Sequence, residues 1–162
     1  MKTFLKILFA TIALCLTAAT AKADNNEKYF DKIGGKSGFS YSYISPLMLK
    51  AMADQYMSDK AYGSLPIRTS SLNMIESLST ATEGQDEKLW ETIRKVKKDK
   101  KLETLSTKKQ DYYRYDMLAR LSGDSKYITN LMVITQNGGE AVDVVYMEGK
   151  IPLESLKYHL NN

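Results

Sequence analysis

A long apolar hairpin near the C-terminus constrains the fold more than any other feature of the sequence. Residues 127–136 and 140–148 are rich in β-branched side chains, and the Asn-Gly-Gly turn at 137–139 tolerates the positive φ of a tight connection. Both faces of the first strand are apolar, with Leu131 on one face and Met132 on the other. Strands of this kind lie inside a sheet that is covered on both sides. The rest of the chain must therefore supply neighbouring strands and the segments that cover them.

The hydrophobic period along the chain predicts these other elements. Alternation over two residues predicts strands over residues 38–44, 72–79, 102–108 and 111–123. Spacing of three and four residues predicts helices over residues 25–35, 46–56, 84–101 and 151–160, with a loop over 57–71. We expect a single α+β domain over residues 24–162. Its order is a helix, a strand-helix-strand-helix unit, a four-stranded antiparallel meander and a C-terminal helix, which gives a single sheet with helices packed on it.

The start of the second helix has the clearest local signal. Ser45 offers a hydroxyl oxygen to unpaired amide groups, and Pro46 fixes φ at the first helical position. Leu49 and Met52 then begin an apolar stripe that continues to Tyr56. We expect Ser45 to cap this helix.

The stretch Arg94–Lys101 (RKVKKDKK) holds six basic side chains in eight residues. On a helix, Leu89, Ile93 and Val96 form one apolar stripe, and the basic side chains take the outward side. A nucleic-acid site usually combines cations with aromatic platforms on a basic domain, and this stretch has no aromatic residue. We interpret it as the solvated side of a helix and expect no nucleic-acid partner; an anionic partner is the alternative.

The first 23 residues have the features of a secretory signal peptide. Lys2 and Lys6 precede a short apolar core, which ends in an Ala-Lys-Ala sequence, so we expect cleavage between Ala23 and Asp24. Removing residues 1–23 takes away three lysines and no acid, which leaves 20 basic and 19 acidic side chains. It also removes Cys15, the single cysteine, so a mature chain would have no thiol, disulfide or cysteine-based zinc site. The apolar core is too short for a membrane-spanning helix.

Residues that usually carry catalysis are scarce. His159 is the single histidine and lies four residues from the C-terminal end, where a surface position is typical. Residues 34–38 (GGKSG) lack the spacing of a phosphate-binding loop, and no Gly-x-Ser-x-Gly motif is present. We therefore expect no enzyme activity, no metal and no cofactor. A hydrolase with an unrecognised pair of carboxylates remains an alternative, with candidates at Asp111, Asp116, Glu140, Asp143 and Glu148.

One polar face has a composition typical of binding surfaces. On the strand at 111–123, one side carries Tyr112, Arg114, Asp116 and Arg120. Tyrosine and arginine are enriched at binding hot spots because they combine large contact areas with directed hydrogen bonds. These four residues are the candidate binding face, and a solvated face with ion pairs across neighbouring strands is the alternative.

The sequence resembles a bacterial family of exported proteins catalogued as domain of unknown function 4252. The resemblance covers nearly the whole chain after the leader and is most specific at Tyr43–Ser45 and in the final hairpin, which runs into residues 149–156 (GKIPLESL). It implies an exported α+β module, and its motifs carry no active-site residue.

Together these features predict a non-enzymatic module of the periplasm or cell envelope, which is either retained there or secreted. The partner we expect is another envelope protein. A carrier of a small or lipidic ligand, held between the sheet and the loop at 57–71, is the alternative. We expect no integral membrane span in the mature form.

Overall fold

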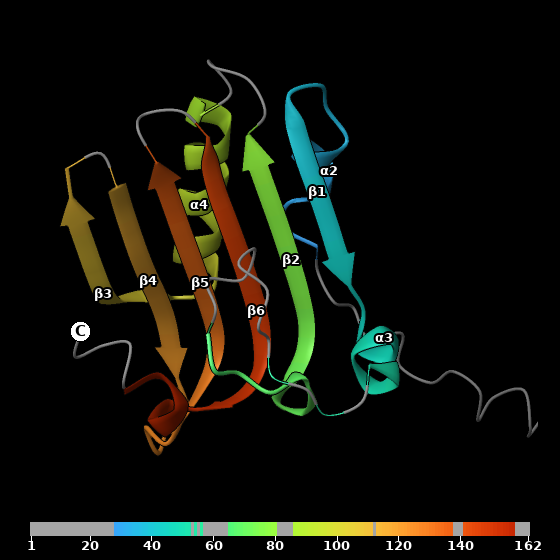
Figure 1. Cartoon of the computed structure of the whole chain (residues 1–162), viewed down its shortest axis with the longest axis vertical. Coiled ribbons are helices and arrows are strands. Elements are labelled where there is room, and N and C mark those ends of the chain that lie inside the picture. The colour runs from blue at the N-terminus through green and yellow to red at the C-terminus, as the bar shows by residue number, and fades with distance from the viewer. Residues whose placement is uncertain are drawn as a thin grey trace, which may run out of the picture.

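A computed structural model describes residues 28–52, 54, 56, 65–80, 86–111, 113–137 and 141–157. They form one antiparallel sheet of six strands in the order β1-β2-β6-β5-β4-β3 (Figure 1). The strands are β1 (Phe39–Ile44), β2 (Leu72–Thr80), β3 (Glu103–Gln110), β4 (Tyr113–Leu121), β5 (Tyr127–Asn137) and β6 (Val142–Pro152). Strands β3 to β6 each pair with their neighbours in sequence, and β2 pairs with β6.

Within the described ranges, the helices are short, with one exception. Helix α4 (Asp86–Asp99) lies across one face of the sheet, behind the strands in Figure 1. Helix α2 (Asp31–Gly34) packs on the same side behind β1. Helix α3 (Pro46–Ala51) follows β1, and two 3-10 turns, η2 (Thr69–Ser71) and η3 (Leu153–Leu156), lie near the same end of the sheet.

Each face of the sheet has its own hydrophobic core. On the α4 face, Leu89, Ile93 and Val96 of the helix stripe are buried against strand residues such as Met132. On the other face, Leu65 and Ile67 are buried against the sheet in a cluster with the opposite-facing strand residues. The final hairpin is apolar on both faces, which predicted strands inside a sheet that is covered on both sides. This prediction is confirmed, because β5 and β6 lie inside the sheet and contribute residues to both cores.

The α+β class with a single sheet is confirmed, but the predicted order of elements differs in detail. The expected helix over 151–160 is wrong in its first part, because Ile151 and Pro152 continue β6 and pair with Ile128 and Tyr127. Only η3 follows, and residues 158–162 lie outside the described residues. The pairing with β5 outweighs the helical period of this segment.

Helices α2 and α3 are also shorter than predicted. In the described part of the expected 25–35 helix, α2 covers only Asp31–Gly34, and residues 25–27 lie outside the described residues; α3 ends at Ala51 rather than near Tyr56. Tyr56 instead forms an isolated antiparallel bridge with Arg68. The predicted cap is confirmed, because Oγ of Ser45 accepts a 3.2 Å hydrogen bond from the amide of Met48.

The basic stretch lies on the solvent side of the longest helix, as predicted. Arg94, Lys95, Lys97 and Lys98 are exposed, whereas Val96 between them is buried. Arg94 forms a 2.9 Å ion pair with Glu87, one of the acidic residues near the start of α4.

Candidate functional site

Two of the residues on the predicted binding face form contacts within the molecule, although the side chain of Arg114 is 43% exposed. Asp116 is buried, and its two carboxylate oxygens accept hydrogen bonds from Arg114 Nε at 2.6 Å and from Thr107 Oγ1 at 2.8 Å. The Arg114 guanidinium lies 5.6 Å from the ring centre of Trp90 on α4. These contacts join α4 to β3 and β4, so Arg114 and Asp116 hold the helix against the sheet. Tyr112 lies outside the described residues.

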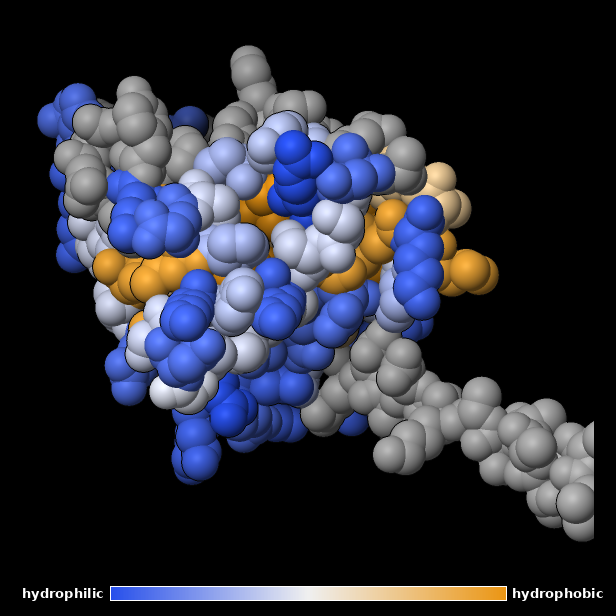
Figure 2. Space-filling view, turned by 90° about the horizontal axis from the view of Figure 1, so that it is seen from below, coloured by the Kyte–Doolittle hydropathy of each residue, from blue (hydrophilic) through white to orange (hydrophobic). Residues whose placement is uncertain are grey.

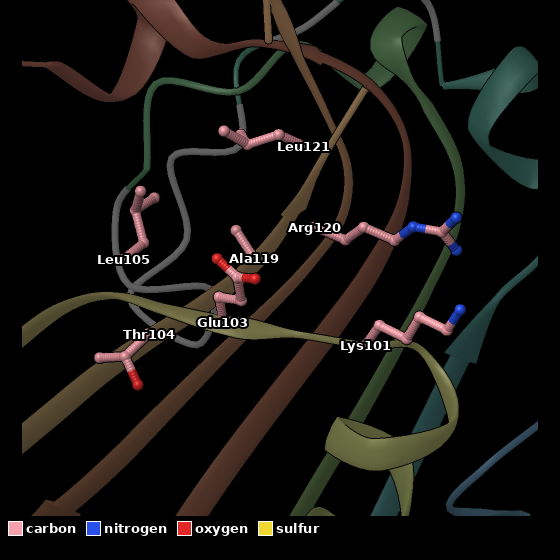
Figure 3. Close-up of a pocket in the computed structure, with 7 residues that line it drawn as sticks. All are labelled: Lys101, Glu103, Thr104, Leu105, Ala119, Arg120 and Leu121. Atoms are coloured by element: carbon pink, nitrogen blue, oxygen red, sulfur yellow. The ribbon is translucent and has the colours of Figure 1, made fainter. Parts of the chain in front are cut away.

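Arg120, the fourth residue of that face, is exposed and lines a hollow between β3 and β4. The hollow has a volume of about 330 Å³ and lies where the register of the two strands shifts, between Thr104 and Ser106. Lys101 and Arg120 extend toward one side of it, and Leu105 and Leu121 line the other (Figure 3). Glu103 also lines the hollow, and its negative charge offsets one of the two cations. The remaining cation beside an apolar wall suits a small amphipathic anion.

Sequence reasoning missed a buried carboxylate on β2. Glu76 has no exposed surface; its Oε2 accepts the amide of Tyr29 at 2.9 Å, and its Oε1 accepts the phenol of Tyr41 at 2.8 Å. Burial raises the pKa of Glu76, and these hydrogen bonds offset only part of that shift. Burial and the bond to Glu76 also raise the pKa of Tyr41 well above its ordinary value. The signal in the sequence was an acid on the same face of the strand as Met74 and Leu78.

A second polar network lies beside the first, near the end of α4. The Tyr146 phenol donates a 2.7 Å hydrogen bond to Oε1 of Glu148 and accepts one from Asn130 at 2.8 Å. Lys100 forms a 3.0 Å ion pair with the same oxygen of Glu148. Burial raises the pKa of Tyr146 far above its ordinary value, and the bond to Glu148 adds to this. The ring of Tyr29 meets that of Tyr146 edge-on, 5.4 Å between centres, which connects the two networks.

Each carboxylate in these networks accepts hydrogen bonds from other groups of the protein. Such groups fix the position of elements, because an unpaired buried polar group costs more than its bond contributes. Within the described part of the chain, no group of three or more His, Cys, Asp or Glu side chains lies close enough to hold a metal ion. His159 lies outside the described residues, as does Glu140 among the candidate acids. Asp111 and Asp143 are exposed.

The most accessible polar backbone lies at the two edges of the sheet. Strand β3 has the devices that protect natural edges from pairing, namely charged side chains such as Lys108 and Lys109 and a bulge. Strand β1 (FSYSYI) has no charged side chain and no proline, and its register with β2 has no shift. Among the described strands, only β2 pairs with β1, so within the described part of the chain one edge of β1 is open.

Exposed apolar side chains lie directly beyond this open edge. Leu47 and Met48 of α3 are 78% and 55% exposed. Only Leu49 of that helix is buried. In a view from below, apolar atoms reach the surface on the side of the molecule where α3 lies (Figure 2). The β1–α3 surface, residues 39–48, therefore combines the backbone groups of the open β1 edge with the exposed apolar side chains of Leu47 and Met48.

Comparisons with known proteins give a family but no activity. No curated protein and no solved structure matches the chain. Among the described residues, no helix has the length and apolar content needed to cross a bilayer. One family model matches residues 29–158, a range that includes all six described strands. The chain therefore belongs to the family described as Domain of unknown function (DUF4252).

Proposed function

We propose that this protein is exported to the periplasm or cell envelope and acts there without catalysis, by binding an extended protein segment at the open edge of β1. The single observation that carries the binding proposal is this edge, which is uncharged and pairs with no other described strand. An added strand would gain main-chain hydrogen bonds along β1, and the alternating side chains would give specificity.

The neighbouring helix favours the same surface. Leu47 and Met48 lie just past the end of β1, where a strand that extends beyond Ile44 would cover them. Exposed apolar groups that are rimmed by polar residues are typical of interaction sites. This surface replaces the Arg114–Asp116 pair as the preferred site, because that pair is committed to α4.

The role without catalysis rests on the way the buried acids are used. Glu76 and Asp116 each accept two hydrogen bonds from protein groups, and neither lines the hollow beside Arg120. Export rests on the leader at 1–23, which lies outside the described residues. The intact mass of the protein recovered from the envelope fraction tests export directly, since cleavage after Ala23 leaves Asp24 as the first residue.

Site-specific photocrosslinking tests the binding surface in the cell. A photoreactive amino acid replaces Ser42 on β1 in one variant and Thr104 on β3, the opposite edge, in the control. Both side chains are exposed, so the fold should tolerate either replacement. We expect a crosslinked product of defined mass from position 42 and none from position 104. Equal labelling at both positions, or none at position 42, would rule out the open edge as the binding site.

A carrier role is the second candidate, supported by the hollow beside Arg120. The predicted ligand position beneath the 57–71 loop finds less support, because Leu65 and Ile67 in the described part of that loop are packed directly on the sheet. At the hollow, titration with decanoate as an anionic amphipathic probe should shift the amide resonances of residues 119–121. Arg120→Ala should reduce the affinity for decanoate at least fivefold, and equal affinity in both proteins would reject this site.

A further inference from the structure

The open edge of β1 has a nearly symmetrical sequence. The residues on either side of Tyr41 repeat in type: Ser40 and Ser42 flank it, and Phe39 and Tyr43 lie beyond them. The aromatic side chains are partly buried against the core on the α4 face, whereas the two serines are exposed on the other face. A strand with this pattern reads the same in both directions, which is what a self-complementary interface requires.

We propose that the segment bound at β1 is the β1 strand of a second copy of this protein, paired antiparallel about a two-fold axis at Tyr41. This inference rests on the proposed function and names the partner of the same edge. The two six-stranded sheets would join into one sheet of twelve strands.

The side chains across this pairing match in chemistry. A two-fold axis perpendicular to the sheet keeps each face on its own side, so directly opposite residues share a face. With the axis at Tyr41, Phe39 faces the partner's Tyr43, and Tyr41 faces the partner's Tyr41. Aromatic cross-strand pairs of this kind are stabilising. On the other face, Ser40 faces the partner's Ser42, which introduces no charge.

Residues beyond the ends of the paired β1 strands would also contact the second copy. If the register continues past the strand, Pro46 faces the partner's Lys36, so α3 of one copy lies beside the turn that precedes β1 in the other. Leu47 and Met48, which are exposed in the single chain, would then gain partial cover. The interface is short, so we expect a dimer with a dissociation constant on the order of 1–100 μM.

Paired charge substitutions at the two exposed serines test both the edge and the register. In Ser40→Lys/Ser42→Lys, each lysine faces a lysine of the partner, and the repulsion should weaken dimerisation roughly tenfold or more. In Ser40→Lys/Ser42→Glu, each lysine faces a glutamate, so dimerisation should return to within about threefold of the original. Thr104→Lys on β3 is the matched control and should leave dimerisation unchanged.

Sedimentation equilibrium is the measurement, applied to protein expressed from the complete reading frame and purified in its processed form. Circular dichroism checks that each variant is folded. The Ser40→Lys/Ser42→Glu variant changes the same two positions, so a dimer in this variant shows that the substitutions themselves do not disrupt the fold. A monomer at all concentrations up to several hundred micromolar would overturn the dimer, yet would leave the crosslinking result at Ser42 to decide whether another protein uses the edge. A dimer that both paired variants leave intact would place the interface elsewhere. Loss in both variants would reject the register at Tyr41.

Discussion

The phenol of Tyr41 donates a 2.8 Å hydrogen bond to the fully buried carboxylate of Glu76, so an edge strand is tied to its neighbour by more than the backbone ladder. Tyr41 also lies against Gly34 of α2, where an added Cβ would come within 2.4 Å of the Tyr41 Cβ. The open edge is therefore held rigidly from behind, and a strand that adds to it meets a preformed template.

Glu76 should make stability depend on pH. Its folded-state pKa is raised above the ordinary value of 4.5, so between these two values the unfolded chain has released the proton and the folded chain retains it. The contribution of Glu76 is therefore fully present below pH 4.5 and decreases as pH rises to the folded pKa. Glu76→Gln keeps one acceptor oxygen for the amide of Tyr29, and its NH2 group can donate to the phenol oxygen of Tyr41, but the side chain does not titrate. Thermal unfolding between pH 4 and 8 should show the wild type losing stability relative to Glu76→Gln; a constant difference would contradict this.

Removal of the same side chain should be costly at every pH. Glu76→Ala removes the buried carboxylate that accepts the partly buried amide of Tyr29 at 2.9 Å and opens a cavity, so we expect a loss of about 2 kcal/mol or more in the free energy of unfolding. Urea denaturation at pH 5 measures it. Ser79→Ala, a partly exposed position on the same strand, is the control and should stay within about 0.5 kcal/mol.

Tyr146→Phe removes one oxygen from the second network. The change deletes the 2.7 Å bond to Glu148 and the acceptor for Asn130, both inside the molecule. We expect the free energy of unfolding to fall by about 1–2 kcal/mol, because the hydroxyl is buried and hydrogen-bonded to a carboxylate. Tyr113→Phe, at an exposed tyrosine, should change it by less than about 0.5 kcal/mol. Equal effects of the two substitutions would show that the network contributes no net stability.

Trp90 is the single tryptophan and reports on the contact between α4 and β4. The Arg114 guanidinium covers its ring at 5.6 Å, so Arg114→Ala should expose the indole. We expect the fluorescence emission to shift to longer wavelength and acrylamide quenching to increase, with circular dichroism unchanged. Arg120→Ala removes a cation from the same strand face without touching Trp90 and should leave the emission as it is. An unchanged spectrum in Arg114→Ala would contradict the packing described for this pair.

Gly149 marks a place where two backbones come unusually close. A Cβ at this residue would lie 2.1 Å from the carbonyl oxygen of Ser71 and 2.8 Å from Cα of Leu72, so the strands β2 and β6 would have to separate locally. We expect Gly149→Ala to reduce the free energy of unfolding by about 2–3 kcal/mol. Gly123→Ala, where a Cβ would meet nothing within 4 Å, is the control and should be nearly neutral. Comparable unfolding midpoints for both would disprove the close approach.

The sequence correctly predicted those features that depend on interactions between residues close together in the chain. The Ser45 cap and the stripe of α4 are set by neighbours within a few residues, and both are found where predicted. The final hairpin was also predictable, because strands that are apolar on both faces have few places to lie. The helix expected at residues 151–160 failed because a helical period there competes with pairing to β5, a contact that the local sequence does not contain.

The candidate site was harder to predict for a similar reason. Arg114 and Asp116 have the composition of a binding face, but α4 covers that side of β4, and only the packing of the sheet decides which face a helix covers. Glu76 appeared to be an ordinary polar residue in a strand, although its position between Met74 and Leu78 placed it on the core face. The open edge of β1 follows from the strand order, which no local pattern encodes.

The position of β6 between β2 and β5 has a consequence for how the protein is made. Among the described strands, β6 is the last to be synthesised, and it joins β1 and β2 to β3, β4 and β5, so the sheet cannot be completed before β6 has emerged. Contacts between such distant segments form late and slow the search for the native state. A chain of this topology cannot complete its sheet while β6 is still being made, which is the unfolded state that the proposed export would need.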